Sequence, residues 1–192
     1  LVDIRRGTRK DMKAKDSIWI EMRDAILDKK TKKSNEVIMC EDDGIVREGL
    51  SSNFFVIKDN FLVQTASEGI LDGTVKQLID KFAEEQSGSI KCDGETLRMA
   101  YSCPSLLELS QWRESFITST SRLILPIYGF VIASDCIQFI DKQAAEKLQP
   151  LDNGDFYYPL LPVESSHISP RAQVLQDVLA QKLNEMCERI IE

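Results

Sequence analysis

Glu48-Gly49-Leu50-Ser51-Ser52-Asn53-Phe54-Phe55 is the stretch that decides the fold, together with Gly69-Ile70-Leu71-Asp72-Gly73-Thr74 further along the chain. The first stretch is typical of a carboxylate on a Gly/Ser turn that runs directly into a buried strand. The second is typical of a tight turn before a helix, whose first backbone N–H groups can hold an anion. A carboxylate and an anion site on one sheet predict a ligand that carries both a protonated ring and a phosphate.

Composition excludes several other classes of function. The chain has 192 residues, 43% apolar and 29% charged, as in a globular domain, and its net charge of −7 argues against a nucleic-acid partner. The longest apolar run, Leu123 to Ala133, contains Pro126 and Gly129 and is too short to cross a bilayer, so we expect no membrane partner. The whole chain is therefore expected to form one domain.

The sequence also gives no sign of a metal site. The five cysteines contain no C-x-x-C pair, and the single histidine, His167, lies in a proline-rich segment. Reduced thiols and no visible signal peptide favour a cytoplasmic protein.

Hydrophobic periodicity predicts an α+β fold, with a curled mixed sheet (a partial barrel) flanked by helices. Helices are expected at 17–27 and, from an Asp72 N-cap, up to a stop at Gly88, with short helical pieces at 96–101 and 105–111. Strands are expected at 36–40, 45–46, 53–58, 61–64, 90–92, 114–118, 122–128 and 130–133. Residues 1–14 are read as a linker-like N-terminal segment, 149–170 as an irregular loop and 171–191 as a C-terminal helix.

The motifs in this order resemble one known family. The run E-G-x-S-S-N-F-F, then Thr65 and G-I-L-x-G, and then Phe116 to Ser121 followed by Leu125-Pro126, resembles the class IV aminotransferases of pyridoxal-phosphate fold type IV. The family includes branched-chain and D-amino-acid aminotransferases and aminodeoxychorismate lyase. The resemblance covers about residues 10–145 and implies the large domain of such an enzyme, with pyridoxal 5'-phosphate as cofactor.

The resemblance also implies a role for particular residues. Lys15 would be the catalytic lysine that holds the cofactor, and Glu48 would pair with the pyridinium nitrogen. The phosphate would be held by three residues at a helix start and two in a later turn: Gly73, Thr74, Val75, Ser119 and Thr120. The family further implies a homodimer that acts on an amino acid, branched-chain or D, and a 2-oxo acid.

Some residues depart from the family pattern. Asp72-Gly73-Thr74-Val75-Lys76 replaces the usual Pro-Gly-Ile-Thr-Arg, so Val75 lacks a hydroxyl and Asp72 adds negative charge near the anion site. The chain also begins almost at Lys15, so the family's small N-terminal domain is expected to be absent. Three interpretations therefore stay open: a transaminase, a lyase of the aminodeoxychorismate type, and a truncated, non-catalytic protein with this fold.

Overall fold

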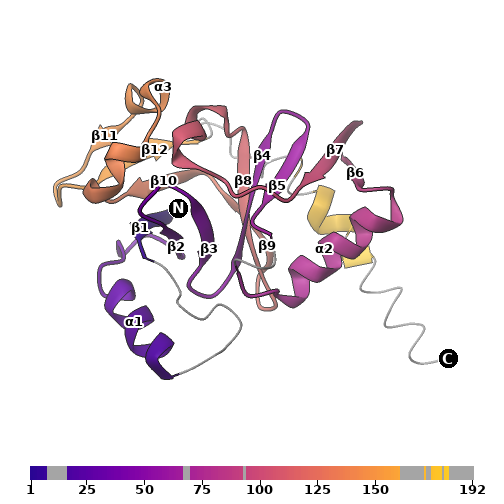
Figure 1. The fold of residues 1–192 in the computed structure, drawn as a ribbon, viewed down its shortest axis with the longest axis horizontal. Helices are drawn as coiled ribbons and strands as arrows, with labels where there is room; N and C mark the ends of the chain where they lie inside the picture. Colours follow the sequence, from indigo (N-terminus) through magenta and orange to yellow (C-terminus); the bar gives the residue numbers. More distant parts are fainter. Residues whose placement is uncertain are drawn as a thin grey trace.

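The computed structural model of the chain describes residues 1–7, 17–66, 70–92, 94–160, 171, 174–178 and 180–181. Its strands belong to one mixed sheet of 12 strands, whose main path runs β11-β12-β10-β1-β2-β3-β4-β5-β7-β6, while β8 pairs with β4 and β9. The sheet divides into two parts that meet at β3 and β4 (Figure 1). The predicted α+β class with a mixed sheet is confirmed, and the sheet is open, not a closed barrel.

Strand β4 (Asn53–Lys58) shows why the sheet is covered on both faces. Phe54 and Val56 point into one hydrophobic cluster, and Phe55 and Ile57 point into another. Because successive side chains on a strand point to opposite faces, an unbroken apolar run fits a strand buried on both sides.

The strands that surround β4 largely follow the predicted positions. Around it lie β2 (Val37–Cys40), β3 (Val46–Gly49), β5 (Phe61–Gln64), β6 (Ser89–Cys92), β8 (Glu114–Ser119), β9 (Leu123–Ile127) and β10 (Gly129–Ile132). The pairs β1–β2, β1–β10 and β5–β7 are parallel, and the other pairs are antiparallel.

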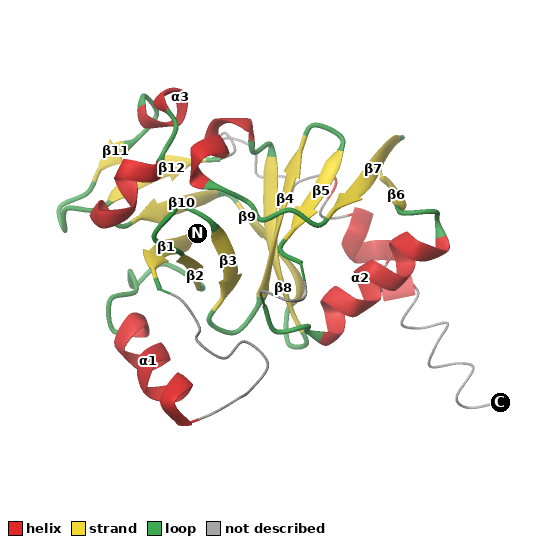
Figure 2. Cartoon of the chain, viewed as in Figure 1, coloured by secondary structure: helices red, strands yellow, loops and turns green. Residues whose placement is uncertain are grey.

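Two helices flank the sheet at the ends of β3 and β4 (Figure 2). Helix α1 (Ser17–Leu27) begins and ends where the sequence predicts, and Met22 and Ile26 pack against a small cluster on β2. Helix α2 (Thr74–Glu85) buries Val75, Ile79 and Ala83 against the face of β4 that carries Phe55. Two 3-10 helices, η2 (Leu106–Gln111) and η3 (Ser134–Phe139), and the short α3 (Lys142–Ala145) follow later in the chain.

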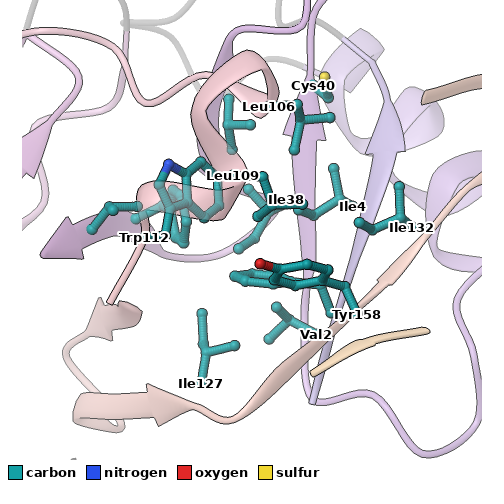
Figure 3. Packing of buried hydrophobic residues seen from close by; sticks show 14 of the residues in the cluster. Val2, Ile4, Ile38, Cys40, Leu106, Leu109, Trp112, Ile127, Ile132 and Tyr158 are labelled. Atoms are coloured by element: carbon teal, nitrogen blue, oxygen red, sulfur yellow. The ribbon is translucent and has the colours of Figure 1, made fainter. Parts of the chain in front are cut away.

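The larger of the hydrophobic clusters lies between η2 and the part of the sheet that contains β1, β2 and β10. Trp112 is its largest side chain, and its ring centroid lies 5.6 Å from that of Phe54 and 5.7 Å from that of Phe130. Figure 3 shows Val2, Ile4, Ile38 and Tyr158 in the same cluster, with Leu106 and Leu109 of η2 over them. This cluster therefore ties the N-terminus, β4 and β10 together.

The N-terminal residues correct one prediction. Val2–Arg6 form strand β1, which lies between β10 and β2, so residues 1–14 are not simply a linker-like segment. Asp3 breaks the apolar pattern yet is fully buried, because Arg5 and the Thr31 N–H (2.8 Å) donate hydrogen bonds to its carboxylate. A buried charge is tolerated when it is paired and hydrogen-bonded in this way.

Two further predictions were wrong. Residues 95–100 form strand β7 (Glu95–Ala100), not a helical piece, and the parallel partner of β7 is β5. The expected irregular loop begins instead with β11 (Gln149–Pro150) and β12 (Phe156–Pro159), and β12 pairs with β10.

The rest of that segment and most of the predicted C-terminal helix are only partly described. Residues 161–170, including His167, lie outside the described residues. The residues described between 171 and 181 are helical, in agreement with the predicted helix, and Leu175 packs against the α2 cluster. Among the described residues, no helix is both long enough and apolar enough to span a membrane, and no three His, Cys, Asp or Glu side chains gather as metal ligands would.

Candidate functional site

The turn between β3 and β4 is shaped by the buried carboxylate of Glu36. The hydroxyls of Ser51 and Ser52 donate to Glu36 Oε2 at 2.5 and 3.2 Å, and the Gly49 N–H donates to the Ser52 carbonyl at 2.8 Å. A Cβ atom on Gly49 would overlap the Ser52 hydroxyl. The Gly/Ser composition of the turn is therefore a consequence of close packing over Glu36.

Glu48 lies on β3 immediately before this turn. Its side chain is buried, with 3% of the residue exposed, and its Oε2 accepts a hydrogen bond of 3.0 Å from the Leu71 N–H. The negative charge of this buried carboxylate lies in the cavity wall, where it would attract a positively charged ligand group more strongly than in water.

The N-terminus of α2 lies beside Glu48. Gly73 is its N-cap, in extended conformation (φ −71°, ψ 151°) and with no side-chain capping bond, so Asp72 is not the N-cap that the sequence predicted. Thr74 and Val75 are the first two helical residues. The first N–H groups of a helix have no intrahelical acceptor and carry the positive end of its dipole, so this end attracts an anion.

The turn after β8 brings hydroxyl groups to the same place. Thr118 is 1% exposed, and its Oγ1 atom is buried with no hydrogen-bond partner among the described residues. Ser119 and Thr120 follow it, and the Ser119 hydroxyl lies 3.3 Å from that of Ser121. A buried hydroxyl without a partner costs free energy, so a ligand that bonds to Thr118 would offset that cost.

These elements enclose one cavity of about 530 Å³. This volume is within the usual range for a small-molecule site, roughly 300–1,000 Å³. It is lined by α1, the β3–β4 turn, the start of α2 and the end of β8: Ile20, Arg23, Glu48, Gly49, Leu50, Ser51, Ser52, Asn53, Leu71, Asp72, Gly73, Thr74, Val75, Thr118, Ser119 and Thr120.

The cavity brings together all the predicted site residues that the structure describes. Glu48 lies at one part of its wall, and the predicted phosphate-binding residues of α2 and of the β8–β9 turn lie at others. Lys15 lies outside the described residues.

Several lining residues of this cavity were not predicted as site residues, among them Arg23, Asn53 and Thr118. Asn53 and Thr118 belong to the quoted motifs but read as ordinary strand positions. Arg23 carries no local signal, because only the packing of α1 brings it to the site. The family resemblance could have drawn attention to Asn53, which lies inside its first motif.

The charge on Asp72 is balanced within α2. The Lys76 ammonium lies 2.8 Å from Asp72 Oδ1 and 2.7 Å from Asp80 Oδ2, and its side chain is fully buried. Burial alone would lower the pKa of Lys76, but the hydrogen bonds to the two carboxylates outweigh it and raise that pKa above its ordinary value. The lysine is therefore a cation at neutral pH, and Asp72 opposes an anion in the cavity less than its sequence position suggests.

A comparison with known families gives a match for this chain. The family described as amino-transferase class IV matches residues 8–129, more than half of the chain. The protein therefore belongs to the class IV aminotransferases, as the motifs indicated. A Methanocaldococcus jannaschii protein assigned as a branched-chain-amino-acid aminotransferase is 27% identical over 121 residues, which are 61% of this chain and 39% of that protein.

Solved structures share the fold. The branched-chain aminotransferase from Thermoproteus uzoniensis, solved with norvaline, superimposes with a TM-score of 0.63 at 17% identity, over 94% of this chain and 50% of that one. The Escherichia coli branched-chain amino acid aminotransferase gives a TM-score of 0.54 at 19% identity, over 67% of this chain and 43% of that one. The chain thus spans half or less of the length of these relatives.

Proposed function

We propose that this cavity binds pyridoxal 5'-phosphate and that the protein is an aminotransferase. The amino group would move between an amino acid and a 2-oxo acid. The observation that carries the proposal is the convergence of a buried carboxylate, a helix N-terminus and a partnerless buried hydroxyl on one cavity. The name of the M. jannaschii relative supports a branched-chain substrate over a D-amino acid.

The cavity residues fit this cofactor chemically. Glu48 would hold the protonated ring nitrogen, while the N–H groups that follow Gly73 would hold the phosphate. The Thr118, Ser119 and Thr120 side chains would add hydroxyl donors to the phosphate. When bound, pyridoxal phosphate supplies an electron sink that stabilises a carbanion at the substrate's α-carbon.

Lys15 would carry and move the proton at that carbon. A lysine can act as a general base only when its amine is neutral, and a nearby cationic group or burial lowers its pKa in that direction. The family resemblance also supports a homodimer, and the scattered cysteines, taken as reduced thiols, support a cytoplasmic location; both are further parts of the proposal. Light scattering on a sizing column would measure the dimer directly.

Three measurements on the purified protein test the proposal. Titration with pyridoxal phosphate should give saturable binding, visible absorbance and a raised melting temperature. Borohydride should then attach the cofactor to the peptide that contains Lys15, as detected by mass spectrometry, and Lys15→Ala should abolish the attachment. Amino transfer from leucine to a 2-oxo acid should follow.

Different results separate the competing interpretations. A protein that binds no cofactor contradicts the proposal and favours a non-catalytic chain with this fold. Cofactor binding together with cleavage of aminodeoxychorismate, and no amino transfer, identifies a lyase. Attachment at another lysine contradicts the assignment of Lys15 alone.

A further inference from the structure

Both backbone polar groups of Leu71 are held by side chains of neighbouring strands. The Leu71 N–H donates to Glu48 Oε2 at 3.0 Å, and the Leu71 carbonyl accepts from Asn53 Nδ2 at 2.7 Å. Glu48 on β3 and Asn53 on β4 are directly paired in the sheet. One residue of the turn before α2 is thus fixed to the strand pair that carries the cavity's buried carboxylate.

The other amide atom of Asn53 lies against Gly73. A Cβ atom placed on Gly73 would meet Asn53 Oδ1 far inside the closest approach that real Cβ atoms show. Gly73 has a negative φ of −71°, which any residue adopts, so it is not glycine for conformational freedom. It is glycine because the Asn53 amide occupies the space of a side chain.

Asn53 also connects these groups to β8, which lines another side of the cavity. It is 5% exposed, and its cross-strand partner on β8 is Thr118, whose buried hydroxyl has no partner. The Asn53 side chain therefore contacts the turn before α2 and the N-cap, from a strand position between the carboxylate and the hydroxyls.

We propose that Asn53 is a positioning residue that sets the spacing between the Glu48 carboxylate and the N-terminus of α2. The role rests on the proposed function, in which these two groups hold the ring and the phosphate of one rigid cofactor. An amide suits the position because it donates to the Leu71 carbonyl while turning a neutral oxygen toward the anion site. Aspartate would lose the donor and place a negative charge there.

The first test compares two ligands that differ only in the phosphate. Asn53→Asp and Asn53→Ser should raise the Kd of pyridoxal phosphate at least about tenfold, as expected when a buried carbonyl loses its donor. The Kd of pyridoxal, which lacks the phosphate, should change much less. Asn35→Asp and Asn35→Ser are the matched controls, because Asn35 is exposed and is not part of the cavity wall.

The second test is a double-mutant cycle between Asn53 and Gly73. Gly73→Ala alone should weaken pyridoxal phosphate binding, because its methyl group displaces the Asn53 amide. Asn53→Ser shortens the side chain and makes room for the methyl group. The Kd of the double variant should therefore be lower than the value expected from multiplying the fold-changes of the two single variants. Urea unfolding of each variant shows that loss of binding is not loss of the fold.

The outcomes separate this role from the function on which it rests. If the unmodified protein binds neither pyridoxal phosphate nor pyridoxal, the proposed function and the positioning role of Asn53 are both contradicted. If it binds pyridoxal phosphate and the Asn53 variants bind equally well, or if the cycle is additive, the positioning role alone is overturned. Equal losses for both ligands identify a purely structural residue and also overturn it.

Discussion

Arg23 gives the cavity a positive charge among lining residues whose other charged side chains, Glu48 and Asp72, are acidic. Its guanidinium is 39% exposed and contacts only the adjacent Asp24 carboxylate among described partners, at 3.3 Å. Such a contact between exposed neighbours is weak, so the guanidinium can turn toward an anion at little cost.

We therefore expect Arg23→Ala to raise the Kd of pyridoxal phosphate about threefold to tenfold, the loss of one solvent-accessible charge contact. Isothermal titration at low and high salt measures this, and the effect should shrink as salt screens the charge. Arg113→Ala is the matched control, since Arg113 is more than half exposed and lies away from this cavity. Equal effects of the two substitutions would contradict a specific role for Arg23.

Glu48 accepts a hydrogen bond from the Leu71 N–H and, in the proposed function, pairs with the ring nitrogen. One substitution can separate these two roles. Glu48→Gln keeps an oxygen that can accept from the Leu71 N–H but removes the charge. We expect a tenfold to hundredfold rise in the Kd of pyridoxal phosphate, about the value of a charge-assisted hydrogen bond, with little change in urea unfolding. Glu36→Gln, a buried carboxylate beneath the same turn, should instead lower stability and affect binding less. If the Glu48→Gln protein has the same Kd for pyridoxal phosphate as the unmodified protein, the pairing of Glu48 with the ring nitrogen is contradicted.

At the scale of the element, α2 depends on a lysine that is fully buried between two carboxylates. Lys76→Met keeps the apolar stem but removes the ammonium group that Asp72 and Asp80 share. We expect a loss of about 2–3 kcal/mol in the free energy of unfolding, less than for a fully buried pair because the Asp72 side chain is 43% exposed. Lys81→Met, at an exposed position of the same helix, should change it little.

The pH dependence of this difference has a definite sign. The folded-state pKa of Lys76 is raised, so its contribution is complete below the ordinary value of 10.5 and is lost as pH rises through the higher folded value. The difference in the free energy of unfolding between the unmodified protein and Lys76→Met should thus be constant near neutral pH. It should disappear as the pH rises above 10.5. A difference that disappears on acidification from neutral pH to about 6 would contradict this account, because the contribution of Lys76 is complete throughout that range.

The sequence predicted those elements whose pattern is local. The unbroken apolar run of β4 and the turn residues around it placed that strand correctly, and the 3.6-residue period placed α2. It missed β1 because Asp3 and Arg5 look solvent-exposed until it is known that Arg5 pairs with both Asp3 and the distant Asp155. It missed β7 because Glu95–Ala100 carries good helix formers, and pairing with β5 and β6 overrides that preference.

At the scale of the whole molecule, the hydrogen bonds and ion pairs of Asp3 and Arg5 join β1 to two distant segments, one at Thr31 and one at Asp155. Asp3 pairs with Arg5 at 2.9 Å, and Arg5 reaches Asp155, next to β12, at the same distance. We expect Asp3→Ala to cost about 3–5 kcal/mol in the free energy of unfolding, because it leaves the Arg5 guanidinium with one fewer buried partner. Thermal unfolding checks this, and Asp152→Ala, at an exposed position, should lie within about 0.5 kcal/mol of the unmodified protein.

The site follows the same division between local and distant information. Its motif residues could be read from the sequence, because each lies in or close to a turn that has a local sequence pattern. Their meeting in one cavity, and the contribution of Arg23 from α1, depend on tertiary packing that no local pattern records.

The central place of β1 also constrains how the chain is made. Strand β1 leaves the ribosome well before β10, one of its two parallel partners, in which Phe130 lies opposite Val2 and Ile132 lies opposite Ile4. Until those late residues are synthesised, one side of β1 keeps its N–H and C=O groups unpaired, and such an edge can recruit other chains. Long-range parallel pairing also forms slowly. This half of the sheet therefore completes its pairing only after β10 has been synthesised, and chains stalled before β10 should be the ones that aggregate or need a chaperone.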